Sequence, residues 1–198
     1  MVVSRKVPGP YLSNKNLGSA DEIVLFVSSG QDLIAERDHF CALVEVVDEQ
    51  MYFALRNRPD RLHLRATRWE NDAAQRAYGD PNGVFRDMAS SATLTVVLLH
   101  NDLRPGTRNE ILAALKRPEV QIAVLCFQPE DASSPETKRL LAFLDRHKKR
   151  FLWNDTGPPG SKESSLTMLK VVARASFDGW RAKFLDDEDL EPYVDDYK

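Results

Sequence analysis

The sequence is short of cysteine and of net positive charge, and each shortage excludes a class of protein. Two cysteines among 198 residues supply neither a disulfide framework nor the ligands of a structural zinc site, and the scattered histidines lack metal-ligand spacing. The formal net charge is -3, with 27 basic and 30 acidic residues, so no positive field favours nucleic acid as a partner. We therefore expect no metal site and no nucleic-acid partner.

Long apolar runs are also missing. No stretch approaches the length of a transmembrane helix, and the first ten residues lack the apolar core of a signal peptide. We expect a cytoplasmic protein without a membrane partner.

The length suits one domain of moderate size. Residues 1–20 are rich in Pro, Gly, Ser and Asn, which predicts an irregular lead-in. Residues 186–198 are dense in acids, which predicts a solvated tail. A single α/β domain is expected between them, over residues 21–185.

Apolar strand-like runs alternate with helical patterns along this domain. The expected strands are residues 23–27, 62–67, 93–99, 121–127 and 151–153. The expected helices follow them at residues 32–53, 84–90 and 107–116, from residue 134 onward, and along residues 166–180. The spacing of Leu166, Leu169, Val172, Ala173, Phe177 and Trp180 suits a long closing helix. The alternation predicts a flavodoxin-like, doubly wound sheet of five parallel strands in the order 2-1-3-4-5, with helices on both faces. That order opens a crevice between the first and third strands, where the loops at 28–32 and 100–106 should face each other.

Glu110 lies beside this crevice and has two interpretations. Thr107 followed three residues later by Glu110 fits a capping box, in which the threonine caps the helix and the glutamate bonds back to it. Alternatively, Glu110 is a catalytic carboxylate, which a helix start would keep ionised.

Ser28, Ser29 and Gly30 follow the first strand and can offer hydroxyl and amide donors to a ribose or phosphate, although the same residues suit an ordinary turn. The single glycine here falls short of the fingerprint of a P-loop or a dinucleotide-binding fold. Arg37 lies on the mostly apolar row of its helix, where it either forms a structural pair or reaches a diphosphate.

Three further residues border the predicted crevice. Trp69 ends the second strand and can stack on a nicotinamide or adenine ring, or cover the core. His100 and Asp102 end the third strand, but without a nucleophilic serine or cysteine in register they do not form a catalytic triad. They remain candidate substrate-binding residues.

Several short motifs resemble a known group. Phe26-Val27-Ser28-Ser29, followed by Asp32-Leu33 and Glu36-Arg37, resembles the opening of bacterial TIR-like domains, with one residue fewer before the aspartate. Trp69, the stretch Gly79-Asp80-Pro81, and Gly106-Thr107 followed by Glu110-Ile111 are similar to later parts of that group. Nucleoside 2-deoxyribosyltransferases carry a similar S-G-T-x-x-E segment, in which this chain has Pro105 in place of the serine. The resemblance adds Asp32, Gly106 and Thr107 to the candidate substrate-binding residues.

In both groups the matching glutamate acts at the anomeric carbon of a ribose, and the resemblance implies this role for Glu110. Cleavage of an N-glycosidic bond builds positive charge on the sugar, which a carboxylate can stabilise or trap. The implied function is an NAD+ glycohydrolase or cyclase, with NAD+ as substrate and no cofactor, in antiphage or stress signalling and with self-association. Two alternatives stay open: a non-catalytic interaction module, and nucleoside deoxyribosyl transfer or nucleotide hydrolysis.

Overall fold

The computed structural model describes residues 22–54, 62–67 and 81–184. The predicted lead-in and acidic tail, Trp69 and most of the loop before residue 81 lie outside these ranges.

All five predicted strands are present and form one parallel sheet. They are β1 (Glu22–Ser29), β2 (His63–Thr67), β3 (Leu94–Leu99), β4 (Gln121–Cys126) and β5 (Phe151–Asp155). Their order is β2-β1-β3-β4-β5, and every neighbouring pair is parallel. The predicted flavodoxin-like order is therefore confirmed.

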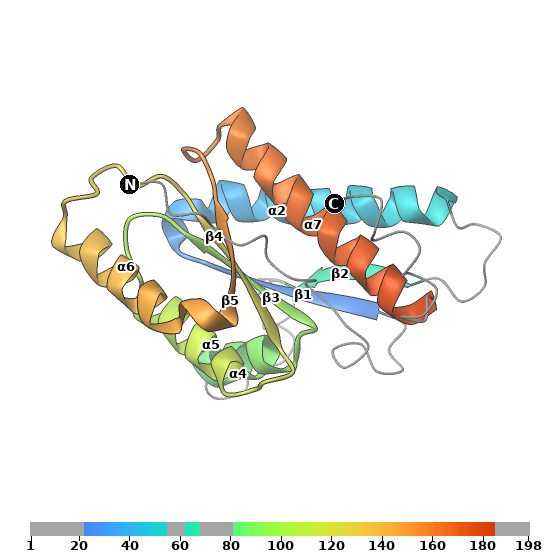
Figure 1. Cartoon of the computed structure of the whole chain (residues 1–198), viewed down its shortest axis with the longest axis horizontal. Helices are drawn as coiled ribbons and strands as arrows, with labels where there is room; N and C mark the ends of the chain where they lie inside the picture. Colours follow the sequence, from blue (N-terminus) through green and yellow to red (C-terminus); the bar gives the residue numbers. More distant parts are fainter. Residues whose placement is uncertain (1–21, 55–61, 68–80, 185–198) are drawn as a thin grey trace, which may run out of the picture.

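Helices cover both faces of the sheet. They are α2 (Ile34–Ala54), which follows the short 3-10 helix η1 (Gln31–Leu33), α4 (Pro81–Ser91), α5 (Pro105–Leu115), α6 (Pro135–His147), which runs into η2 (Lys148–Arg150), and α7 (Lys162–Phe184). Helices α2 and α7 lie together on one face, and α4, α5 and α6 lie on the other (Figure 1).

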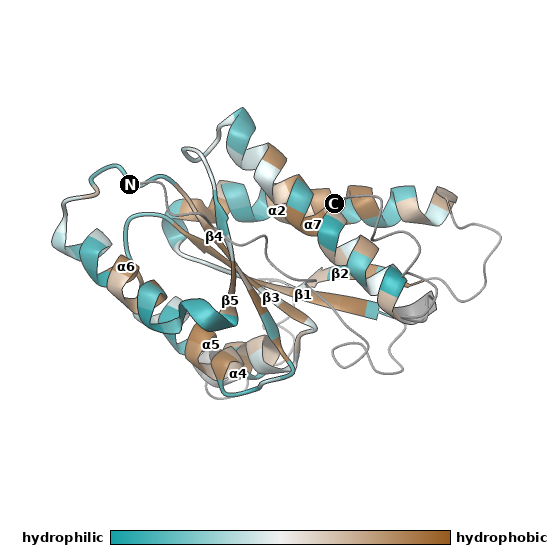
Figure 2. Cartoon of the chain, in the orientation of Figure 1, coloured by the Kyte–Doolittle hydropathy of each residue, from teal (hydrophilic) through white to brown (hydrophobic). Residues whose placement is uncertain are grey.

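The core is built on the central strands. All six residues of β3 are buried, as expected for a parallel strand covered on both sides. Figure 2 shows a largely hydrophobic sheet between helices that carry both hydrophilic and hydrophobic residues. The buried part of the sheet includes the strands β1 and β3, and the predicted crevice lies at their carboxyl ends.

Helix α7 forms where predicted, and it buries one of its sides. Its core residues are Met168, Val171, Val172 and Ala175, which follow the i, i+3, i+4, i+7 spacing of one helix side. Of the apolar residues that indicated this helix, Val172 is buried, whereas Leu166 and Phe177 are 49% and 56% exposed. The helix comes close to β1 at Gly179, where a Cβ atom would overlap the side chain of Ile23.

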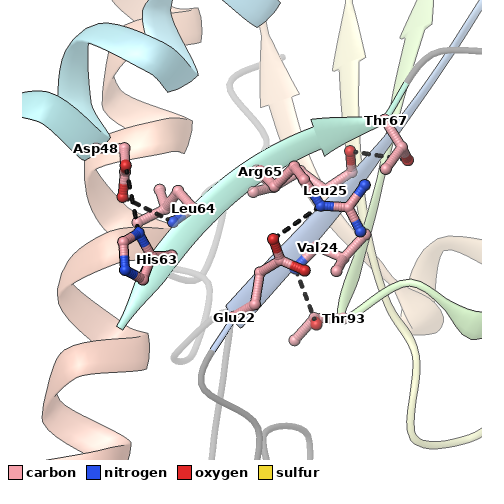
Figure 3. Close-up of polar contacts among 9 residues, drawn as sticks. All are labelled: Glu22, Val24, Leu25, Asp48, His63, Leu64, Arg65, Thr67 and Thr93. Carbon is pink, nitrogen blue, oxygen red and sulfur yellow. Dashed lines mark hydrogen bonds and ion pairs between the residues drawn. The ribbon is translucent and has the colours of Figure 1, made fainter. Parts of the chain in front are cut away.

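The edge strand β2 is held at its start and along its length by polar contacts (Figure 3). The Leu64 amide donates to Asp48 Oδ1 of α2 at 2.9 Å, and Arg65 Nε donates to Glu22 Oε1 at 2.8 Å. These contacts lie near the amino ends of β1 and β2, whereas the crevice lies at the carboxyl ends of the strands. Their role is to fix the edge strand.

Among the described helices, none combines the length and apolar character needed to cross a membrane. Cys41 is buried and Cys126 half-buried, and both are free thiols.

Candidate active site

The centre of the predicted crevice is a contact between β1 and α5. Ser28 Oγ donates a short hydrogen bond to Glu110 Oε2. Ser28 is 2% exposed and pairs in register with Val97 of β3, so its hydroxyl is fixed by the sheet. The structure thus brings together two candidate residues that are far apart in the sequence.

Helix α5 begins earlier than predicted, and this overturns the capping interpretation of Glu110. Pro105 is the first helical residue and Arg104 takes the N-cap position without a side-chain capping bond. Proline is favoured at the first helical position because its fixed φ suits the helix and the missing N–H would be unbonded there. Thr107 is therefore inside the first turn and buried, and Glu110 lies in the second turn, where its carboxylate bonds Ser28 instead of the cap.

The electrostatics of Glu110 also differ from the prediction of a carboxylate kept ionised by a helix start. Burial raises the pKa of the Glu110 carboxyl above its ordinary value. The hydrogen bond from Ser28 and the positive charge of Arg37 oppose that rise. Because desolvation is the largest of these effects, the Glu110 carboxylate is more basic than a solvated glutamate despite the hydroxyl and the positive charge near it.

Arg37 is 3% exposed. Its position on the buried side of α2 agrees with the predicted apolar row, and its charge acts on Glu110. The structure thus brings the buried charge of Arg37 close enough to act on the Glu110 carboxylate.

A second cluster links the two facing loops. Asp32 Oδ2 lies 3.8 Å from His100 Nδ1, and Asp32 Oδ1 lies 3.7 Å from Arg104 Nη2. Arg104 Nε lies 3.6 Å from Asp102 Oδ1. The loops after β1 and β3 therefore face each other, as the strand order predicted.

Gly30 makes this approach possible. A Cβ atom there would overlap Asp32 Oδ1 and lie 3.5 Å from Arg104 Nε. The close packing of the Asp32 carboxylate over the backbone explains a glycine at this position.

Two other predicted residues contribute less. The Ser29 hydroxyl is buried and has no hydrogen-bond partner among the described residues. Gly106 is exposed in the first turn of α5, and a Cβ atom placed there would have no neighbour within 4 Å. Trp69 lies outside the described residues.

Arg104 is the residue of this site that the sequence analysis missed. It joins Asp32 to Asp102 and precedes the helix. A signal was present in the sequence, since an arginine directly before a helix-starting proline at a strand end is placed over the crevice.

No group of three or more histidine, cysteine or carboxylate side chains within the described ranges is arranged to hold a metal ion. The chemistry available is that of a carboxylate with a hydroxyl and a guanidinium beside it.

Comparisons with known proteins add a fold likeness and nothing more specific. No family model and no curated protein matches the chain. Among solved structures, rubredoxin oxygen:oxidoreductase from Desulfovibrio gigas is similar with a TM-score of 0.45 and 12% identity, over 84% of this chain and 38% of that one. The flavodoxin-like domain of a Synechococcus protein is similar with a TM-score of 0.44 and 8% identity, over 80% of this chain and 99% of that one. Flavodoxin 1 from Bacillus cereus is similar with a TM-score of 0.37 and 8% identity, over 83% of this chain and 99% of that one.

The class that the strand order defines is a flavodoxin-like α/β domain. The resemblance to TIR-like domains stays a prediction.

Proposed function

We propose that the chain is a TIR-like NAD+ glycohydrolase or cyclase, which cleaves the bond between nicotinamide and ribose with Glu110 as the catalytic carboxylate. The observation that carries the proposal is the bond from Ser28 to Glu110 at the junction of β1 and β3, the place where open α/β sheets bind ligands. The motif resemblance supplies the substrate class.

The geometry supports a defined role for each group. Glu110 Oε2 is held by Ser28, while Oε1 makes no hydrogen bond within the described residues and is available to the ribose. As nicotinamide leaves with the bonding electron pair, positive charge develops on the ribose, and the carboxylate stabilises it or forms a bond to the anomeric carbon. Water then completes hydrolysis, giving ADP-ribose, nicotinamide and a proton, or a second group of the same substrate closes a ring.

The raised pKa of Glu110 suits this role at neutral and basic pH. A more basic carboxylate is the better nucleophile once it has lost its proton, and the Ser28 hydroxyl and Arg37 favour the deprotonated form. Arg37 acts as a positioning residue, since it is buried and works through the carboxylate.

The proposal also includes a cytoplasmic location, where thiols such as Cys41 and Cys126 stay reduced, and self-association as a condition for activity. Both come from the sequence analysis. Specific activity measured over a range of protein concentrations tests the second, because it should rise as the chain associates.

The central test is release of free base, measured by chromatography, from NAD+, nucleosides and nucleoside monophosphates. We expect release of nicotinamide from NAD+, and a loss of about 10³-fold or more in Glu110→Gln, the order seen when a catalytic group is removed. Glu119→Gln is the matched control, because Glu119 is 48% exposed and pairs with Arg117 outside the crevice.

Each other outcome has a definite meaning. Undiminished NAD+ consumption in Glu110→Gln contradicts the role of Glu110. Base release from nucleosides or monophosphates alone favours the transferase or hydrolase alternative, and no release from any substrate at any protein concentration favours the interaction module.

A further inference from the structure

A second polar region lies outside the crevice, between α5 and α6. It is a surface pocket of about 480 Å³, lined by Asp102, Leu103, Arg108, Glu136, Arg139, Ala142, Phe143 and Arg146. Its volume falls within the range of small-molecule sites, roughly 300–1,000 Å³.

The three guanidinium groups of this pocket are unusual in their bonding. The guanidinium groups of Arg108, Arg139 and Arg146 form no hydrogen bond and no ion pair with the part of the chain that the structure describes. Elsewhere, Arg65, Arg117 and Arg174 each donate to a carboxylate at 2.7–2.9 Å. Three unpaired arginines from two helices around one pocket offer a binding site for an anion, since guanidinium groups suit phosphate oxygens.

The pocket also has an apolar wall. The Arg108 guanidinium lies 6.0 Å from the centre of the Phe143 ring, and Leu103 and Ala142 complete the surface. A flat ring can pack against an aromatic side chain and against the plane of a guanidinium.

The acidic groups of the pocket define the ligand further. Asp102 and Glu136 can only accept hydrogen bonds when ionised, so they repel phosphate and favour hydroxyl or amino groups. Glu136 and Arg146 are ten residues apart on α6, which is about 15 Å along a helix. Glu136 and Arg146 therefore lie toward opposite ends of the pocket, with Arg139 one turn from Glu136.

We propose that the α5–α6 pocket binds a nucleoside diphosphate, with its phosphates on Arg139 and Arg146 and its ribose hydroxyls toward Asp102 and Glu136. The base packs against the Arg108–Phe143 pair. This site borders the Glu110 crevice at Asp102 but does not include Glu110 or Ser28, and it does not depend on the proposed NAD+ cleavage.

The test is calorimetric titration of the whole chain with ADP, with adenosine and inorganic pyrophosphate as the two half-ligands. We expect ADP to bind at least about tenfold more tightly than either half, because only ADP meets both ends of the pocket. The double variant Arg139→Glu, Arg146→Glu should weaken ADP binding by about tenfold or more. Its matched control is Lys138→Glu, Lys149→Glu, which makes the same charge change at exposed positions outside the pocket.

A second variant, Ala142→Trp, fills the pocket without changing charge and should also abolish ADP binding. Amide NMR shifts locate the ligand: ADP should move the signals of Leu103, Ala142 and Phe143. Equal loss in the lysine control, unchanged binding in Ala142→Trp, or shifts confined to Ser28 and Gly30 would each overturn the proposal. So would binding of RNA or a phosphopeptide without binding of ADP.

Discussion

The crevice and the α5–α6 pocket lie near each other at one end of the sheet, yet their polar groups are bonded in opposite ways. In the crevice, Glu110 bonds Ser28 and Asp32 lies within ion-pair distance of His100 and Arg104. In the pocket, the guanidinium groups have no such partners among the described residues. Groups already held in place can stabilise developing charge without reorganising. Guanidinium groups without a partner instead contribute binding free energy when a ligand brings the opposite charge.

This contrast predicts that substitutions in the crevice change reactivity and its pH dependence, while substitutions in the pocket change affinity. The largest effect below that of Glu110 itself is expected at Ser28. Ser28→Ala removes the hydrogen bond that lowers the pKa of Glu110, so that pKa should rise further. Base release from NAD+ at pH 6 should fall by about tenfold or more, and its acid limb should move to higher pH.

Ser29→Ala is the control for this experiment, because the Ser29 hydroxyl has no hydrogen-bond partner within the described residues. It should leave the pH profile in place. A Ser28→Ala profile that coincides with that of the parent protein would mean that the hydrogen bond does not set the pKa of Glu110.

A smaller effect is expected on stability. A carboxyl whose pKa is raised in the folded state binds more protons there than in the unfolded state, so stability falls as the pH rises through the window between the two values. Glu110→Gln removes this penalty and should stabilise the fold by about 1 kcal/mol at pH 8. Urea unfolding should show the gain disappearing below the ordinary glutamate pKa of 4.5.

The control here is again Glu119→Gln. The pKa of the Glu119 carboxyl is lowered, by its own backbone and by Arg117, so its replacement should not stabilise the protein at pH 8. Destabilisation by Glu110→Gln at that pH would show that the carboxylate contributes more to the fold than its burial costs.

The smallest effect is expected at Arg104, which connects the crevice to the pocket through Asp32 and Asp102. Its side chain is 42% exposed and both ion pairs are long, at 3.7 and 3.6 Å. Arg104→Ala should therefore cost only about 0.5 kcal/mol of unfolding free energy. A loss of about 2 kcal/mol or more would mean that the two regions form one structural network.

The fold could be predicted because its signals are local and repeated. Each strand is an apolar run with its own boundaries, and alternation with helices leaves few possible topologies. The buried β3 and the order of the strands follow from these patterns. The inward face of α7 did not follow, since the helix carries apolar residues on more than one side. Packing against α2 and the sheet selects Met168 and Val172 over Leu166.

The candidate site could be predicted only in part. The sequence placed Ser28 and Glu110 at the same crevice, but a serine hydroxyl and a glutamate give no sign that they will bond each other. The pattern Thr107 to Glu110 suggested a cap that Pro105 replaces. The pocket was missed because Arg108 and Arg139 lie on different helices, where each alone is indistinguishable from a solvated surface residue.

The contact between Gly179 and Ile23 has a consequence for how the protein forms. Ile23 belongs to the first described strand and Gly179 to the last described helix. The face of the sheet that α2 and α7 share is therefore only partly covered until nearly all of these residues have left the ribosome. Apolar side chains such as Leu25 and Val96 are exposed to other chains during that interval. Helix α7 is thus the step that ends the risk of aggregation during synthesis.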